Sequence, residues 1–273
     1  MKTLLLPTDF SPCAHRAFRY AALLAEASGA RIVLLHVFGL PVSTVHEVPA
    51  DVSHQVTFEE KRAQEALTRF RDAVLAETGF TAERVETRVR YGFIADAIVG
   101  MARHEAADFI VMGTQGARNL LDRWLGTNAQ RVVGEAPCPV LVVPADAPVE
   151  TPRTVLYAAD YDRDEAVALN AVTQFANTFG ARTRVVHIHP YYELPVEKTA
   201  RALKEAYETD EVNFRNLNRD EIPEAIETYM RTHKPDVLAL AVYEKGFWEK
   251  LLMPSVTSHF LQHGHVPVLV VRK

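Results

Sequence analysis

Residues 139–143 read Pro-Val-Leu-Val-Val, and residues 267–271 repeat the same five letters. These strings end one of two ungapped internal matches, which align Lys2–Val37 with Arg153–Ile188 and Asp108–Val143 with Asp236–Val271. Matches that recur in the same order indicate one structural unit present twice. The sequence therefore predicts two copies of one domain, of which the second is shorter in its middle.

A proline-containing segment separates the two copies. Pro144, Pro148 and Pro152 fall within nine residues, and proline is disfavoured in both helix interiors and central strands. We therefore expect two independently packed domains, residues 1–146 and residues 152–273.

Each copy alternates short apolar runs with amphipathic stretches. Leu4–Leu6 is an apolar run ended by Pro7, which is typical of a strand buried on both faces. Ser11 and Pro12 are expected to open a helix that Gly29 ends. The other elements expected in the first copy are strands at 32–37, 85–89, 109–112 and 140–143, and helices at 58–77, 94–104 and 128–134. This alternation predicts an α/β fold with two repeated, doubly wound parallel-sheet domains.

The composition excludes several classes of protein. Of the 273 residues, 48% are hydrophobic and 24% charged, and no apolar run is long enough to span a bilayer. The net charge of -5 argues against nucleic acid as a partner. Two cysteines cannot build a disulfide framework, and the short apolar run near Met1 ends before it reaches signal-peptide length. We expect a cytoplasmic protein.

A glycine motif follows the strand predicted at 109–112. Gly113, Gly116, Gly126 and Thr127 form the pattern G-x2-G-x9-G-[ST], which leads into a helix. Glycines allow consecutive backbone amides to surround an anion, and the first amides of a helix suit a polyphosphate. In a doubly wound sheet, ligands bind outside the carboxyl ends of the strands, where this loop and the Pro7-Thr8-Asp9 loop are expected.

Two interpretations of this motif remain. The glycines either form a phosphate site or only turn the chain and cap a helix. Under the first interpretation the Asp9 carboxylate could orient the nucleoside or hold Mg²⁺. Neither a P-loop nor a G-x-G-x-x-G fingerprint occurs in the sequence, so P-loop hydrolysis and dinucleotide-dependent oxidation are not supported.

The sequence resembles the universal stress protein family, in which this glycine pattern marks members that bind ATP. The resemblance covers both copies and includes Pro7–Ser11, Leu35–Val37, Met112-Gly113 and Pro137–Val143. It implies a Rossmann-like fold of the adenine nucleotide alpha hydrolase type. It also implies that Val37 holds adenine through its backbone, that Thr8 and Asp9 flank the nucleoside, and that the glycines with Thr127 take the phosphates. The residues expected at the ATP site, with Mg²⁺, are Pro7, Thr8, Asp9, Val37, Met112, Gly113, Gly116, Arg118, Gly126, Thr127 and Asn128.

The second copy departs from this pattern. Alignment places Ala241, Glu244, Pro254 and Ser255 opposite the three glycines and the threonine. Glu244 would bring a negative charge to the phosphates, and Pro254 has no amide to donate. We expect only the first domain to keep a nucleotide site.

The sequence leaves three functions open. The first is a regulatory binding module, whose ATP-bound state an unknown partner protein or a second copy recognises. The second is a slow Mg²⁺-dependent ATP hydrolase or phosphotransferase, although the sequence offers no catalytic triad and we assign no catalytic residue. The third is an interaction protein with a vestigial pocket. Strands 140–143 and 268–271 are expected to pair and so to join the two domains as an intramolecular pseudo-dimer, and a homodimer is also open.

Overall fold

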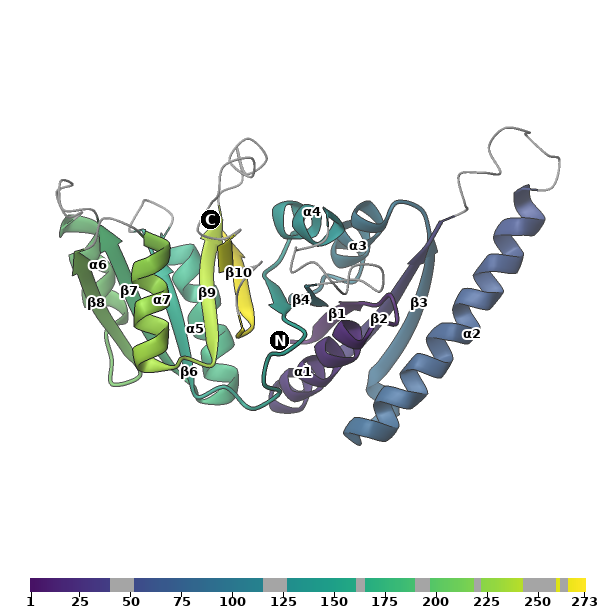
Figure 1. Ribbon diagram of the computed structural model, residues 1–273, viewed down its shortest axis with the longest axis horizontal. Helices are drawn as coiled ribbons and strands as arrows, with labels where there is room; N and C mark the ends of the chain where they lie inside the picture. Colours follow the sequence, from purple (N-terminus) through teal and green to yellow (C-terminus); the bar gives the residue numbers. More distant parts are fainter. Residues whose placement is uncertain are drawn as a thin grey trace. The chain divides into compact units, whose positions relative to one another are not determined.

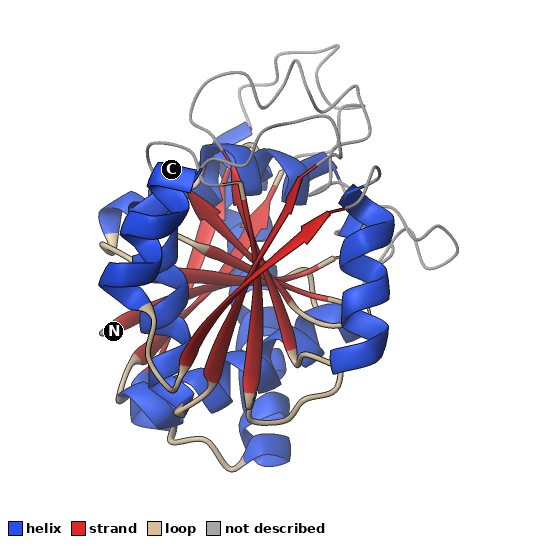
Figure 2. Ribbon diagram, turned by 90° about the vertical axis from the view of Figure 1, so that its left-hand side faces the viewer, coloured by secondary structure: helices blue, strands red, loops and turns tan. Residues whose placement is uncertain are grey.

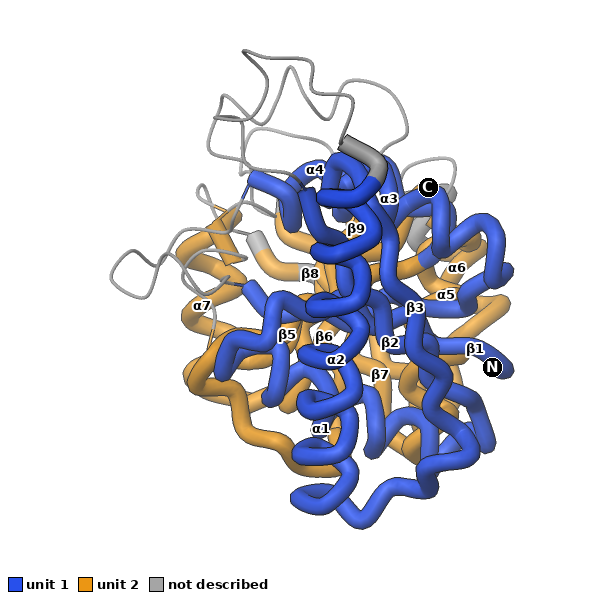
Figure 3. Tube along the Cα trace, turned by 90° about the vertical axis from the view of Figure 1, so that its right-hand side faces the viewer, with its two compact units in different colours: residues 1–138 blue, residues 139–273 orange. Residues whose placement is uncertain are grey.

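The chain forms two compact units, Met1–Cys138 and Pro139–Lys273 (Figure 3). The structure is a computed structural model. It describes residues 1–39, 52–114, 127–160, 165–189, 197–218, 222–242, 259–260 and 265–273. Each unit is described by itself below.

Unit 1 is built on a parallel sheet with the strand order β3-β2-β1-β4. Its strands are β1 (Thr3–Pro7), β2 (Arg31–Phe38), β3 (Val85–Tyr91) and β4 (Phe109–Gly113). The core lies along β1 and its neighbours, where Leu4, Leu5 and Leu6 have no exposed surface. The predicted α/β class and parallel pairing are confirmed.

Helices cover both faces of this sheet (Figure 1). They are α1 (Pro12–Ser28), α2 (Val52–Thr78), α3 (Ile94–His104) and α4 (Thr127–Glu135), with a short 3-10 turn η2 (Ala82–Arg84) before β3. α1 packs with α2, and α3 packs with α4. The chain adds strands on one side of β1 up to β3 and then crosses to the other side to form β4, so the strand order reverses between β1 and β4. This is the place where doubly wound folds bind ligands.

Helix α1 begins and ends as its sequence predicts. The Ser11 hydroxyl accepts a hydrogen bond from the Ala14 amide at 3.2 Å, and Pro12 occupies the first turn. Gly29 ends the helix with φ of 74°, a left-handed conformation that favours glycine. In the second repeat the aligned Gly180 has φ of 64°, so this identity between the repeats has a structural cause.

The prediction for α2 was too short. The helix begins at Val52 rather than at residue 58. Val52, Val56 and Thr57 are β-branched and disfavour helix when taken alone. The buried residues of α2 lie further along, from Ala63 to Val74, so the first turns extend a helix that is anchored elsewhere.

Unit 2 contains a sheet with the order β5-β10-β9-β6-β7-β8. Its strands are β5 (Val140–Val143), β6 (Thr154–Ala159), β7 (Arg182–His189), β8 (Val212–Asn218), β9 (Val237–Val242) and β10 (Val268–Arg272). Its helices are α5 (Glu165–Phe179), α6 (Glu197–Tyr207) and α7 (Ile222–His233), and helices flank the strands on both sides (Figure 2). Within the described ranges of either unit, no helix has the length and apolar character needed to cross a membrane.

Strands β5 and β10 form the one antiparallel pair among the described strands. Leu141 lies opposite Leu269, between the pairs Val140–Val270 and Val142–Val268. The predicted contact between these strands is confirmed. Because of it, β5 packs in unit 2 although its sequence ends the first repeat, and the units divide after Cys138. The domain limits 1–146 and 152–273 follow the repeat and remain a prediction.

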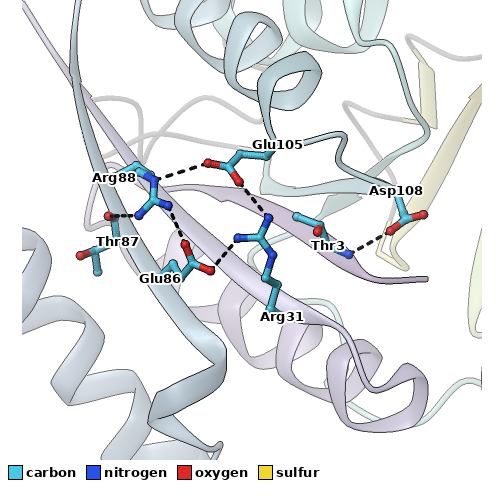
Figure 4. A network of polar contacts seen from close by, with 7 residues as sticks. All are labelled: Thr3, Arg31, Glu86, Thr87, Arg88, Glu105 and Asp108. Carbon is cyan, nitrogen blue, oxygen red and sulfur yellow. Dashed lines mark hydrogen bonds and ion pairs between the residues drawn. The ribbon is translucent and has the colours of Figure 1, made fainter.

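One carboxylate fixes the start of the first strand in each repeat. Asp108 accepts hydrogen bonds from the backbone amides of Lys2 and Thr3, at 2.6 and 2.9 Å. Asp236, its counterpart, accepts from the amides of Arg153, just before β6, and Thr154, its first residue, both at 2.8 Å. Asp108 and Thr3 are drawn in Figure 4. We call this arrangement, in which one carboxylate accepts from two successive backbone amides, the aspartate bracket. It explains why the repeats share an aspartate at a position far from the predicted ligand.

An ion network lies beside this bracket in unit 1 (Figure 4). Arg31 of β2 bonds Glu86 at 2.7 Å and Glu105 at 2.9 Å, and Arg88 bonds Glu86 at 2.6 Å. The hydrogen bond from Arg31 is the main cause that lowers the pKa of the Glu86 carboxyl. The network ties β2, β3 and the end of α3 together at the amino edge of the sheet, opposite the expected ligand edge.

We predict that Asp108→Ala and Asp236→Ala destabilise the chain to similar extents. Each change removes a charged acceptor from two backbone amides, so each should lower the free energy of unfolding by about 1–3 kcal/mol. Urea unfolding followed by circular dichroism measures this. Asp108→Asn, which keeps one acceptor oxygen, is the control and should cost less. An unchanged unfolding midpoint in both alanine variants would contradict the bracket.

Candidate functional site

The carboxyl ends of β1 and β4 meet at the reversal point of the unit 1 sheet. β1 pairs with β4 in the register Leu4–Phe109 and Leu5–Ile110. Continuing this register sets Pro7-Thr8 opposite Met112-Gly113. Four of the residues predicted from sequence therefore lie at one edge of the sheet.

The turn between β1 and α1 is held by its own side chains. The Thr8 hydroxyl accepts from the Phe10 amide at 3.0 Å, and Asp9 Oδ1 accepts from the Ser11 amide at 3.1 Å. Phe10 adopts φ of 66°. Thr8 is buried whereas Asp9 is exposed, so the turn presents the Asp9 carboxylate at the surface of this edge.

Strand β2 continues beyond the point where β1 ends. Pairing with β1 stops at Pro7–Leu35, and the Thr8 amide then donates to the Leu35 carbonyl at 2.8 Å. In a parallel strand, alternate residues direct their N–H and C=O groups to the same side. The polar backbone groups of Val37 therefore point towards the β1 side of β2, past the last residue of β1. The expected contact between adenine and the Val37 backbone requires these groups to face this side.

His36, the residue before Val37, connects the end of β2 to the turn that follows β1. Its Nδ1 lies 2.8 Å from the Thr8 carbonyl oxygen. Because a carbonyl only accepts, Nδ1 carries the proton. Burial is the main cause that lowers the pKa of His36, against the opposing effects of Thr8 and Asp9. Its ring centroid lies 4.3 Å from that of Phe10.

The second repeat keeps this histidine contact. His187 Nδ1 lies 2.8 Å from the Ala159 carbonyl oxygen, which is the counterpart of the Thr8 carbonyl. The same bond therefore occurs where the glycine motif is altered. His36 and His187 act as structural links between the first two strands of each repeat, and this role was not predicted from sequence.

Gly113 has a packing role that its motif does not suggest. A Cβ added there would lie 2.8 Å from the Cβ of Cys13 and 3.1 Å from its backbone carbon and oxygen. Helix α1 thus approaches the end of β4 so closely that a side chain is excluded. The glycine is required by this approach whether or not a phosphate binds nearby.

Helix α4 begins with two of the predicted residues. Thr127 and Asn128 are exposed in its first turn, where the backbone amides have no intrahelical acceptors. Arg131, one turn later, bonds Asp96 at 2.8 Å and so ties α4 to α3. Gly116, Arg118 and Gly126 lie outside the described residues, so the structure describes both ends of the glycine motif but not its centre.

We predict that Gly113→Ala lowers the free energy of unfolding by about 1–3 kcal/mol, because the added methyl group overpacks against Cys13. Cys13→Gly removes the atom that it meets, so the double variant should recover part of the loss. Thermal unfolding of the two single variants and the double variant measures this coupling. Strictly additive effects would show that the close approach is not the cause.

Comparisons with known proteins identify the family and its two copies. The sequence model of the universal stress protein family matches residues 1–144 and again residues 151–272. A universal stress protein encoded beside a sulfhydrylase gene in Thermus aquaticus is 39% identical over 144 residues, covering 52% of this chain and 98% of that protein. Universal stress protein G of Salmonella typhimurium is 35% identical over 145 residues, again covering 52% and 98%.

A solved structure extends the likeness to the whole chain. The crystal structure of a universal stress protein from Archaeoglobus fulgidus covers 99% of this chain and 98% of its own, with a TM-score of 0.77. At 19% identity it shows the fold alone. Two matches of the family model together span nearly the entire sequence, and the protein is therefore a member of the universal stress protein family with two domains in tandem.

Proposed function

We propose that the first repeat binds ATP with Mg²⁺ at the carboxyl edge of β1, β2 and β4, and that the protein acts as a nucleotide-dependent binding module in a stress response. The observation that carries this proposal is the backbone of Val37, which faces the space beyond the end of β1. The family to which the chain belongs and the glycine motif of its first repeat support ATP as the nucleotide.

The described residues fit the nucleoside end of such a ligand. One N–H donor and one C=O acceptor of Val37 match the donor and acceptor edge of adenine. Thr8 and Asp9 lie at the end of the adjacent strand, close to where a ribose attached to that base would be. Their turn is already held by the bonds to Phe10 and Ser11, so little ordering is needed on binding.

Two features support binding of the phosphates of ATP, namely the first turn of α4 and the glycine motif. The exposed start of α4 at Thr127 offers unsatisfied amides and the positive end of a helix dipole. Gly113, at the end of β4, opens the loop that leads there. Gly116, Arg118 and Gly126 complete the expected cradle, and their roles rest on the motif alone.

Mg²⁺ would take oxygen ligands at this edge. Asp9 is the exposed carboxylate that the β1–α1 turn presents, and one of its oxygens already accepts the Ser11 amide. A carboxylate has more than one acceptor site per oxygen, so this bond is compatible with a metal or ribose contact.

In this proposal, nucleotide occupancy stabilises one conformation of the first repeat, which a partner protein or a second copy of the chain in the cytoplasm recognises. A nucleotide bound at this edge would itself change the surface that a partner meets. The function requires no bond cleavage.

We predict that the full chain binds one ATP, and that Gly116→Glu with Gly126→Pro abolishes binding. These changes introduce a negative charge and remove an amide, copying Glu244 and Pro254 of the second repeat. Isothermal titration calorimetry with MgATP measures both the stoichiometry and the loss.

The matched control changes the second repeat instead. Glu244→Ala with Ser255→Ala should leave ATP affinity within about twofold of the parent chain, since distant sites act independently. Circular dichroism verifies that all variants are folded. Undiminished affinity in the first-repeat variant would refute the proposed site.

A further inference from the structure

A cluster of ionisable side chains lies at the carboxyl edge of unit 2. The Lys273 ammonium bonds Glu165 Oε2 at 2.6 Å and also contacts Asp160 Oδ1. The Tyr157 hydroxyl donates to Glu165 Oε1. The four residues come from the end of β6, the start of α5 and the residue after β10.

The cluster is buried except at one point. The side chains of Glu165 and Lys273 are each 1% exposed, whereas that of Asp160 is 51% exposed. Tyr157 has no exposed surface. The Lys273 backbone amide donates to the Val242 carbonyl of β9 at 3.0 Å, which fixes the side chain above the edge where β10, β9 and β6 are neighbours.

The first repeat has apolar residues at three of these positions. By the two alignments, Tyr157, Glu165 and Lys273 replace Leu6, Ala14 and Ala145, while Asp160 keeps the aspartate of Asp9. Burying a lone lysine or a lone glutamate costs several kcal/mol. Glu165 and Lys273 together form an ion pair, and the Tyr157 hydroxyl adds a hydrogen bond to Glu165, so the three side chains form one unit.

One ammonium faces two carboxyl groups in the cluster. The pKa of Glu165 is raised to about 7, with burial as the largest cause and a hydrogen bond with Asp160 acting in the same direction, while Lys273 and Tyr157 lower it. Lys273 has its pKa raised by both acids despite burial. Among the described residues, Tyr157, Asp160 and Lys273 are the ionisable groups that contact Glu165.

We propose that this cluster is an internal lock that takes the place of a ligand in the second repeat. The Lys273 ammonium, held between Asp160 and Glu165, ties the end of β10 to β6 and to the first turn of α5. The cluster thereby holds the ends of β6 and β10 and the first turn of α5 together without any bound nucleotide. This inference does not depend on ATP binding by the first repeat.

The lock also disfavours a phosphate at this edge. The ammonium is enclosed and already shared by two acids, so it is not available to an external anion. The exposed group of the cluster is the Asp160 carboxylate, which repels phosphate. The second repeat is expected not to bind a nucleotide because its glycine motif is altered. The exposed Asp160 carboxylate is a second cause.

Peptide-level hydrogen–deuterium exchange on the full chain tests the lock, because it reports on unit 2 separately from unit 1. Lys273→Met keeps the length of the side chain and removes its charge. We expect exchange in peptides covering the end of β6 and the start of α5 to accelerate at least tenfold. Lys204→Met, which breaks an exposed pair with Glu208 at 3.5 Å, is the control and should leave these peptides unchanged.

A double variant separates the ion pair from simple packing. Glu165→Gln with Lys273→Met removes both charges, so its exchange should be slower than in Lys273→Met alone. The single variant should also exchange faster at pH 8 than at pH 6 after correction for intrinsic rates, since Glu165 then ionises without its partner. The double variant should show no such pH effect.

Two results would overturn the lock. One is exchange in Lys273→Met that is as slow as in the parent chain. The other is a double variant that exchanges as fast as Lys273→Met or fails to fold, because the loss would then not come from an uncompensated carboxylate.

Discussion

The candidate site depends on one constraint, which is that β1 ends before β2 does. The bond from the Thr8 amide to the Leu35 carbonyl marks this point. Beyond it, β2 continues with β3 as its partner, and the polar backbone of Val37 faces the side that β1 has left. The tight turn at Thr8–Ser11 and the His36 bond to the Thr8 carbonyl hold this ending in place. In the proposed site, the base is therefore bound by backbone N–H and C=O groups of β2 that do not pair with β1.

The two repeats share this framework and differ in what lies at its edge. The aspartate brackets at the amino edge, the left-handed glycines after the first helices and the histidine bonds recur in both. These features account for identities between the repeats that are independent of any ligand. The second repeat has a buried ion cluster beside Asp160 at its carboxyl edge, and the positions aligned with Tyr157, Glu165 and Lys273 in the first repeat are leucine or alanine. One framework thus carries different side chains at the carboxyl edges of the two repeats.

The sequence was sufficient to predict the fold because its signals are local or repeated. Buried strands such as Leu4–Leu6, the cap at Ser11 and the glycine at Gly29 each specify their element through neighbouring residues, and the repeat extends the result to the second half. The pairing of Val140–Val143 with Val268–Val271 was also predicted, from the free edges of the final strands and from the family resemblance. The start of α2 was predicted poorly because the β-branched residues there disfavour helix, although the helix does extend through them.

The site was predicted in part. Pro7, Thr8, Met112 and Gly113 do meet at one edge, but the packing of Gly113 on Cys13 depends on a helix approach that no sequence pattern encodes. The cluster of Tyr157, Glu165 and Lys273 escaped prediction because its members are far apart in the chain and each is unremarkable alone. The most direct measurement is a crystal structure of the full chain grown with MgATP. The account predicts density for one nucleotide in the first repeat, with its base beside the Val37 backbone, and a nucleotide at the Asp160 edge of the second repeat would contradict it.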